Sequence, residues 1–279
     1  MRRAGPAAGP TRRAGSPATP ARRRQPDTHR ELGGDQVEGR RAVRELLVAG
    51  RRTVRDIWLS ETVDEGPLVA EILDLAEEAR VTVRRVSRAR LDAEARTEAP
   101  QGVLAHARPL QPVDLEQLCR PARAGQAKPF LLALDGVSDP QNLGALLRTA
   151  EVAGVTGVVL PRHRAAHVTP AVAKAAAGAI EYLPIALVSG LPAALATMAG
   201  AGVWTVGLDP SAAAPLWSLT LGTEPVAVVL GAEGAGLSRL TAQRSDVRLA
   251  IPHVGQVDSL NVAAAGALAM FEVARRRLG

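Results

Sequence analysis

Three segments of the chain carry polar side chains that could bind an anion or a small molecule, and each follows an apolar run. The first segment, residues 135–148, contains Asn142 and Arg148. Asp139 followed by Pro140 predicts a helix start, which puts Asn142 in the first turn, where free N–H groups favour an anion. Arg148 lies off the apolar stripe and could present a guanidinium to a phosphate, although a solvated helix arginine is the ordinary interpretation of such a position.

The second segment, residues 226–238, leaves an apolar run through Gly231, Gly234 and Gly236. Glycine lets a ligand approach the backbone closely, and Glu233 adds a lone carboxylate to this loop. The spacing G-x-x-G-x-G reverses the dinucleotide-binding fingerprint and lies near the C-terminus. We therefore exclude a Rossmann NAD site.

The third segment, residues 251–261, begins with Ile251 and ends in Ser259, Leu260 and Asn261. It leads into a final helix, for which Asp258 or Ser259 is the predicted N-cap. Arginines at 275–277 would complement the dipole at the other end of this helix. Only alanine and glycine occupy positions 263–267, which predicts very close packing against neighbouring backbone.

The apolar runs that precede these segments predict a parallel sheet. Six such runs alternate with helical stretches, a pattern typical of an α/β fold with helices on both faces of a mostly parallel sheet. Ligands bind such sheets at the carboxyl ends of the strands, so the loops after the runs are the candidate sites. The predicted strands are residues 130–134, 156–160, 183–188, 203–208, 226–230 and 247–251.

The chain divides into four parts. Residues 1–34 form an Arg- and Pro-rich tail that is predicted to be disordered, and residues 36–108 a small α/β unit with 13 basic and 13 acidic side chains. Residues 109–128 are a predicted linker with one short helix, and residues 129–279 the large unit. The tail alone carries a charge of +6, which equals the net charge of the chain. It could be a salt-sensitive RNA-binding arm, a dispensable extension or an organellar presequence.

Composition excludes several classes of protein. Aromatic residues make up 2% of the chain, which argues against rows of stacking rings, and the single cysteine, Cys119, cannot form an intramolecular disulfide. The histidines have no metal-site spacing, and no apolar run approaches the ~18 residues of a membrane span. We therefore expect a cytoplasmic protein that binds neither a metal nor a membrane.

Taken together, in this order and spacing, the three segments resemble the SpoU (TrmH-like) family of RNA ribose 2′-O-methyltransferases, within the SPOUT superfamily. The resemblance is strong over residues 129–279 and weaker over residues 36–108. In the small unit it rests on Glu38-Gly-Arg-Arg-Ala-Val43 and Gln101-Gly-Val103, which are similar to the family's substrate-binding unit. Within the family, the resemblance is closest to the bacterial enzymes that methylate a guanosine of 23S rRNA.

The resemblance implies a fold in which the C-terminal segment is tucked through a loop as a trefoil knot. It implies a homodimer that acts on RNA and binds S-adenosylmethionine, with Gly231, Ile251 and Leu260 as the main cofactor contacts. The family's polar residues correspond to positions that are all occupied by the expected side chains here, namely Asn142, Arg148, Glu233, Ser259 and Asn261.

Roles for these polar residues follow from the chemistry of methyl transfer to a ribose hydroxyl. Arg148 would grip the 2′-hydroxyl and a neighbouring phosphate, since a guanidinium stays protonated and is poorly suited to accept a proton. Asn142, Ser259 and Asn261 would orient RNA and loops. Glu233 would hold Arg148 or a loop amide.

Several functions agree with this sequence. The main hypothesis is a 23S rRNA guanosine 2′-O-methyltransferase. The same chemistry on tRNA, or on an rRNA adenosine as in thiostrepton resistance, is an alternative, as is a catalytically silent RNA-binding ribosome-assembly factor. The complete polar set weighs against the silent factor. The RNA surface is predicted near Arg40 and Arg41 and around Arg162 and Arg164.

Overall fold

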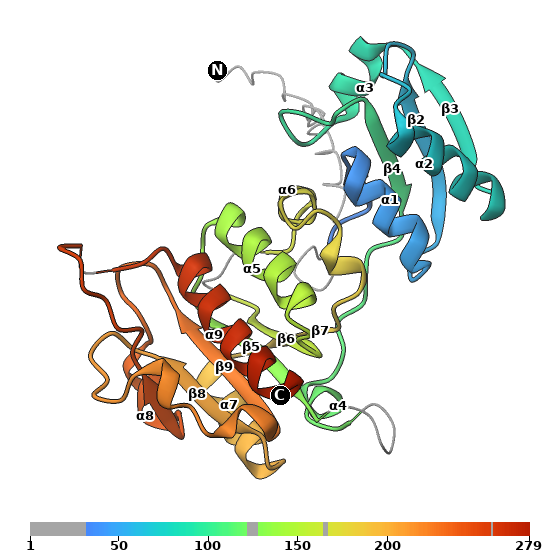
Figure 1. Cartoon of the computed structure of the whole chain (residues 1–279). Helices are drawn as coiled ribbons and strands as arrows, with labels where there is room; N and C mark the ends of the chain where they lie inside the picture. Colours follow the sequence, from blue (N-terminus) through green and yellow to red (C-terminus); the bar gives the residue numbers. More distant parts are fainter. Residues whose placement is uncertain (1–31, 122–127, 164–166, 258) are drawn as a thin grey trace, which may run out of the picture.

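The computed structural model describes residues 32–121, 128–163, 167–257 and 259–279. It consists of two α/β units that follow one another along the chain (Figure 1). Most of the predicted tail, residues 1–31, lies outside the described residues. Leu32 pairs with Leu110 through N–H···O bonds of 3.1 and 3.0 Å, and the Gly33 N–H donates to the Val168 carbonyl at 2.7 Å. Residues 32–34, which the sequence pattern predicts to be part of the tail, therefore belong to the folded body.

The small unit is a four-stranded mixed sheet with helices packed on it. Its elements are β1 (Gln36–Glu38), α1 (Arg40–Ala49), β2 (Val54–Ser60), α2 (Pro67–Glu78), β3 (Thr82–Val86), α3 (Arg88–Glu94) and β4 (Val103–Ala107). The strand order is β1-β4-β2-β3, with β4 antiparallel to both of its neighbours and β2 parallel to β3. α1 and α2 cover one face, where Leu46 and Ile72 pack with Ile57 and Leu59.

The first helix begins later than the sequence pattern predicts. Apolar spacing predicts a helix over residues 37–49, but α1 starts at Arg40 and residues 36–38 form β1. Val37 pairs with Ala105 of β4, and all three residues of β1 are buried. Gly39 makes the turn into α1 with φ 94°, which glycine adopts readily. Pairing with a distant strand thus overrides the local helical pattern.

The large unit is a six-stranded sheet in the order β10-β8-β9-β5-β6-β7, and every neighbouring pair is parallel. This confirms the predicted α/β class. After the short α4 (Leu115–Leu118), its elements are β5 (Phe130–Asp135), α5 (Pro140–Val152), β6 (Gly157–Pro161), α6 (Pro170–Ala175), η1 (Ala179–Glu181), β7 (Ile185–Val188), α7 (Leu191–Gly200), β8 (Trp204–Leu208), η2 (Leu216–Ser218), η3 (Leu221–Thr223), β9 (Val226–Gly231), α8 (Arg239–Arg244), β10 (Val247–Leu249) and α9 (Val262–Leu278).

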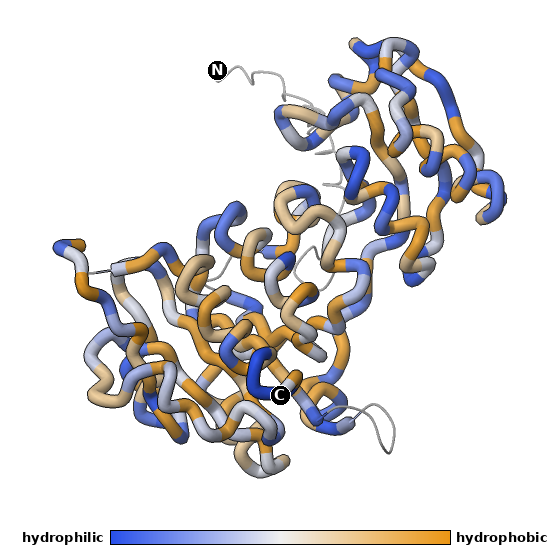
Figure 2. Tube along the Cα trace, viewed as in Figure 1, coloured by the Kyte–Doolittle hydropathy of each residue, from blue (hydrophilic) through white to orange (hydrophobic). Residues whose placement is uncertain are grey.

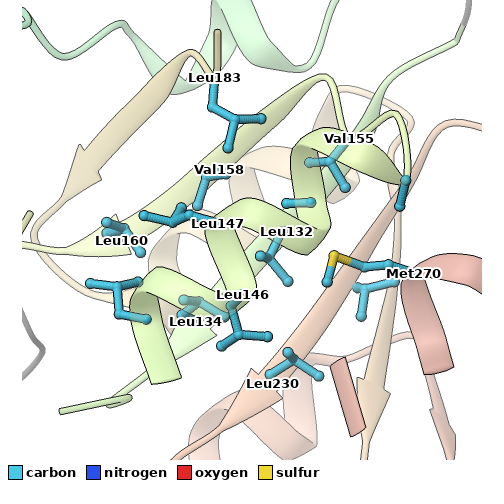
Figure 3. Packing of buried hydrophobic residues seen from close by; sticks show 14 of the residues in the cluster. Leu132, Leu134, Leu146, Leu147, Val155, Val158, Leu160, Leu183, Leu230 and Met270 are labelled. Atoms are coloured by element: carbon cyan, nitrogen blue, oxygen red, sulfur yellow. The ribbon is translucent and has the colours of Figure 1, made fainter. Parts of the chain in front are cut away.

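Helices cover both faces of this sheet. α5, α6 and α9 pack on one face, while α4 and α7 pack on the other. Figure 2 shows hydrophobic residues concentrated along the strands between these layers. In Figure 3, Leu146 and Leu147 of α5 lie over Leu132 and Leu134 of β5, with Met270 of α9 beside them. The strands are therefore buried on both faces, as their continuous apolar runs predict.

α9 lies unusually close to α5 and β9. A Cβ added at Gly266 would overlap the side chain of Leu146 and come within 2.7 Å of Leu230 Cδ1. The close packing predicted for residues 263–267 is thus confirmed at Gly266, whereas Ala264 is exposed. Because α5 and α9 are held this tightly, the residues at their N-terminal ends keep a fixed spacing.

The end of α9 is fastened to the sheet by Arg277. Its guanidinium donates to the carbonyls of Lys128, Pro129, Gly222 and Glu224 at 2.7–3.0 Å. It also lies over the Phe130 ring, at 5.0 Å from the centroid. Burial lowers the pKa of Arg277 from its usual range. The sequence predicts that this arginine complements the helix dipole, whereas its donors bind carbonyls in η3 and just before β5 and β9.

Replacing Arg277 with alanine is expected to lower the free energy of unfolding by about 2 kcal/mol, because four carbonyls lose a charged donor. The matched control is Arg275→Ala, since the Arg275 side chain is 67% exposed and pairs with Glu272 alone among the described residues. That change should cost less than about 1 kcal/mol. Urea unfolding followed by circular dichroism measures both, and equal losses would contradict the role given to Arg277.

A buried ion pair joins the two units. Arg52, in the turn before β2, contacts Glu181 of η1 at 3.1 Å, and their side chains are 0% and 1% exposed. Burial raises the pKa of Glu181, and the Arg52 guanidinium opposes that rise. Arg52 also donates to the Arg108 and Gly34 carbonyls. Because a buried charge is costly without its partner, this pair favours one arrangement of the two units.

Candidate active site

A pocket of about 610 Å³ opens where the sequence predicted a site, at the carboxyl ends of β8 and β9. Its walls are the loop after β8, the glycine loop after β9 and the segment that enters α9. Six of the eight residues singled out in the sequence line it: Gly231, Glu233, Ile251, Ser259, Leu260 and Asn261. Asn142 and Arg148, both on α5, do not line this pocket.

Asn142, Glu233 and Asn261 meet at one edge of the pocket, and we call them the amide–carboxylate cluster. Asn142 Nδ2 and Asn261 Nδ2 both donate to Glu233 Oε1, the second at 3.4 Å. Asn261 Nδ2 also donates to Asn142 Oδ1 at 3.0 Å. The three side chains come from α5, the loop after β9 and the start of α9. The cluster therefore ties three distant segments together beside the pocket.

Helix capping positions two members of this cluster. The Asp139 carboxylate caps α5 by accepting from the N–H groups of Gln141 and Asn142 at 3.3 and 3.1 Å. The first-turn N–H groups that the sequence analysis offered to an external anion are therefore occupied by Asp139. Asn261 caps α9, its Oδ1 accepting from the N–H groups of Ala263 and Ala264 at 2.8 and 3.3 Å.

Asn261 thus replaces the N-cap that the sequence predicted. Ser259 is exposed and lies three positions before the first residue of α9, and Asp258 lies outside the described residues. Both the amide oxygen and the amide nitrogen of Asn261 have partners, the oxygen in the helix and the nitrogen in the cluster. The orientation of this side chain is therefore determined from both ends.

Replacing Asn261 with serine should separate these two roles, because serine also caps helices but has no amide to donate to Glu233 and Asn142. We expect the free energy of unfolding to change by less than about 0.5 kcal/mol. Catalytic turnover should fall by about tenfold, because a less well-oriented cluster raises the activation free energy by roughly 1.4 kcal/mol. Thermal unfolding and an activity assay on the same preparation test this. Unchanged turnover in the Asn261→Ser variant would make Asn261 a helix cap only.

Gly231 owes its place to the fold of its own loop. After β9 the chain turns back on itself, so that Ala232 and Gly236 exchange backbone hydrogen bonds of 3.0 and 2.8 Å. A Cβ at Gly231 would overlap the carbonyl group of Gly236 and the nitrogen of Leu237. Glycine at this position is therefore needed to let the loop close and carry Glu233. At Gly231 the need for glycine thus comes from the loop's own backbone, where the sequence pattern predicts close approach of a ligand.

Arg148 stands apart from the cluster. It is exposed on α5, six positions after Asn142, and forms no hydrogen bond or ion pair with another described residue. Within the described residues, the side-chain amides of Asn142 and Asn261 donate to Glu233 in place of Arg148. The guanidinium remains available to a substrate.

The loop after β8, which is absent from the predicted site residues, supplies another wall of the pocket. Asp209 accepts from the Ser211 hydroxyl at 2.7 Å, the Ser211 N–H at 2.9 Å and Arg248 Nη1 at 2.9 Å. The hydrogen bond from Ser211 is the main reason that the pKa of Asp209 lies below its usual range. The position of Asp209, directly after the predicted strand 203–208, was the available signal.

The described residues contain neither a metal-binding cluster nor a membrane-spanning helix. No group of three or more His, Cys, Asp or Glu side chains in this part of the chain is arranged to hold a metal ion. Among the same residues, no helix combines the length and the apolar character that a membrane span requires.

Comparisons with known proteins agree with the geometry. Residues 129–271 match the SpoU rRNA Methylase family model, and residues 36–113 match the family model for RNA 2′-O ribose methyltransferase substrate binding. The chain is 39% identical over 246 residues to the 23S rRNA (guanosine-2′-O-)-methyltransferase RlmB of Pseudomonas putida, covering 87% of this chain and 97% of that protein. RlmB of Pseudomonas syringae pv. tomato is 38% identical over 243 residues, covering 87% and 96%.

A solved structure agrees with these matches. The crystal structure of the AdoMet-bound rRNA methyltransferase from Sinorhizobium meliloti superposes with a TM-score of 0.69 at 25% identity, covering 88% of each chain. The resemblance that the three sequence segments indicated is thereby confirmed. The chain belongs to the SpoU rRNA Methylase family.

Proposed function

We propose that the protein transfers a methyl group from S-adenosylmethionine to the ribose 2′-hydroxyl of a guanosine in 23S rRNA. The observation that carries this proposal is the amide–carboxylate cluster at the edge of the pocket, with Arg148, which has no partner among the described residues, on the same helix as Asn142. The choice of a 23S rRNA guanosine follows the two RlmB relatives at 38% and 39% identity. We infer that the protein acts in the cytoplasm, because its proposed substrate is ribosomal RNA and because a single cysteine cannot form an intramolecular disulfide.

The pocket fits S-adenosylmethionine. Its volume of about 610 Å³ lies within the range of roughly 300–1,000 Å³ that small-molecule sites occupy. Leu208, Ile251 and Leu260 offer apolar surface for an adenine ring, and the glycine loop offers backbone polar groups beside it. We assign the main cofactor contacts to Gly231, Ile251 and Leu260. Asp209 adds a carboxylate that could face the positively charged groups of the cofactor.

When bound, S-adenosylmethionine supplies an electrophilic methyl group for displacement by the ribose oxygen. The chain's own residues must then align that oxygen. Arg148 would bind the 2′-hydroxyl and an adjacent phosphate through its free N–H donors. The amide–carboxylate cluster holds the glycine loop and the start of α9 in register, and the exposed Ser259 hydroxyl can orient the RNA.

We also propose that the protein is a homodimer and that its chain is knotted. α5 and α9 pack together and expose Val152, Leu268 and Phe271, whose relative exposures are 65%, 40% and 48%. Arg148, one helical turn before Val152, would lie in this interface beside the neighbouring subunit's pocket. The knot is supported by Ala250, which bonds to Ala214 and Leu216 of the loop after β8 before the chain turns into α9.

Phe271→Asp tests the dimer. The variant should sediment as a monomer, because a charge on an apolar interface must be desolvated, and its methylation should fall with dimer content. Leu240→Asp is the control, since Leu240 is 51% exposed on α8, away from α5 and α9. Unchanged sedimentation of the Phe271 variant would exclude this face as the interface.

The function is tested by incubating the protein with radiolabelled S-adenosylmethionine and unmodified 23S rRNA and identifying the labelled nucleoside. We expect 2′-O-methylguanosine. Labelled 2′-O-methyladenosine would favour a resistance-type enzyme, and label on tRNA alone would move the substrate there. Cofactor binding without label on any RNA would contradict methyl transfer to free RNA. No cofactor binding would favour the silent ribosome-assembly factor.

A further inference from the structure

A second and larger cavity lies where the small unit meets the large one. It has a volume of about 960 Å³ and shares no lining residue with the candidate active site. We call it the junction cavity. Its walls are the start of α1, the turns that follow β2 and precede β4, part of α3, and Lys174 and Ala177 from the other unit. Figure 1 shows α6, which carries Lys174, between the small unit and α5.

Two sequence motifs of the small unit meet in the wall of this cavity. The Gly39 N–H donates to the Val103 carbonyl at 3.1 Å, and the Arg40 N–H donates to Gln101 Oε1 at 3.2 Å. Gln101 has φ 58°, a conformation that a residue with a side chain adopts at a cost. Ala177, on the opposite wall, has φ 51°. Strained backbone that lines a cavity from both units is typical of functional sites.

A buried carboxylate organises one side of the cavity. Glu38 is 0% exposed and accepts from Gln36 Nε2, the Arg96 and Thr97 N–H groups and the Thr97 hydroxyl. These hydrogen bonds fasten the loop before β4 to the Glu38 carboxylate. They place Thr97 on the side of this loop that faces the large unit. There Lys174 Nζ donates to Thr97 Oγ1 at 3.3 Å.

Two cationic side chains, Arg41 and Lys174, line the same cavity as Thr97 and Gln101. The Lys174 ammonium has three N–H donors, of which Thr97 takes one. Arg41 is exposed and makes no hydrogen bond or ion pair within the described residues. The complete lining is balanced, with four basic and four acidic side chains. A balanced lining does not attract a long polyanion, whereas it suits a ligand that combines one phosphate with neutral hydrogen-bonding groups.

We propose that the junction cavity holds one unpaired nucleotide of the RNA substrate, distinct from the nucleotide that is methylated. This proposal rests on the proposed function for the identity of the RNA. The phosphate lies against Arg41 and Lys174, and the base hydrogen-bonds to the polar wall near Thr97 and Gln101. Bases in RNA loops are unstacked and available for such recognition, and the cavity is large enough for one.

The position of the cavity fixes the distance between a nucleotide bound there and the active site. α6 lies tightly on α5, because a Cβ at Gly144 would overlap Ala175. α5 in turn carries Asn142 and Arg148. The buried Arg52–Glu181 ion pair joins the small unit to η1 of the large unit. A nucleotide in the cavity therefore stands at a set distance from the active site and selects which ribose reaches Arg148.

The test compares Lys174→Ala and Arg41→Ala with Arg55→Ala, which removes the same charge from an exposed side chain outside the cavity. Affinity for unmodified 23S rRNA is measured without cofactor, so that the result holds whether or not this RNA is methylated. We expect about tenfold weaker binding for each cavity variant and a salt slope smaller by about 0.7–0.9, the loss of one phosphate contact. The control should stay within about twofold. Affinity for S-adenosylmethionine should not change.

Photo-crosslinking with 4-thiouridine-substituted 23S rRNA supplies an independent measurement. We expect a crosslink to residues 95–102, and its loss in the Lys174→Ala, Arg41→Ala double variant. Lys174→Arg should restore RNA affinity, and melting temperatures within a few degrees would show that the variants fold. Affinities equal to the control, or crosslinks that survive the double change, would overturn the proposal. Weaker binding only to assembled ribosomal particles would assign the cavity to a protein partner instead.

Discussion

Replacing Arg148 with alanine is expected to lower the rate of methylation by about 100- to 1,000-fold, the usual effect of removing one group that stabilises a transition state. The side chain is exposed and has no partner among the described residues, so its loss should leave the free energy of unfolding nearly unchanged. Affinity for RNA should fall by no more than about tenfold, because Arg148 supplies one phosphate contact among many, and affinity for S-adenosylmethionine should stay within about threefold.

Single-turnover methylation with saturating RNA separates this effect from binding. Arg148→Lys keeps the charge but loses the planar fork of donors, and we expect it to recover only part of the rate. The control is Arg120→Ala, since Arg120 is exposed after α4 and its side chain is 75% accessible. Methylation at the wild-type rate in the Arg148→Ala variant would remove this residue from the reaction.

Replacing Gly231 with alanine is expected to weaken S-adenosylmethionine binding by about 10- to 100-fold. The added Cβ would overlap the backbone of Gly236 and Leu237, and backbone cannot move aside as the end of a side chain can. Overpacking of this kind costs about 1–3 kcal/mol, most of which should appear as displacement of the loop that carries Glu233. The amide–carboxylate cluster would then lose its central acceptor.

Isothermal titration calorimetry with S-adenosylmethionine measures this loss. Gly234→Ala is the control in the same loop, because its Cβ would meet nothing within 4 Å. Gly234 has φ 71°, so that change costs about 1 kcal/mol of strain without an overlap. Equal affinities for the two variants would show that loop closure does not govern cofactor binding.

The sequence by itself determined the class of fold, the strands of the large sheet and the loops that carry the site. Buried strands of a parallel sheet need apolar residues on both faces, so 226–230 and its counterparts are continuous apolar runs that are recognisable without tertiary information. Asp139 and Pro140 predicted the start of α5 because capping depends on neighbouring residues. Family membership was also evident from the order and spacing of three local segments.

Only the tertiary structure decided which side chains meet. Glu233 bonds to Asn142 and Asn261, which are 91 and 28 positions away, and the expected contact with Arg148 does not occur. β1 is a strand because it pairs with β4, and the Arg277 guanidinium binds carbonyls of η3 and of the segment before β5. The junction cavity needs residues from both units. Local sequence determines propensity and capping, whereas the contact between distant segments depends on how helices and strands pack, which no local pattern encodes.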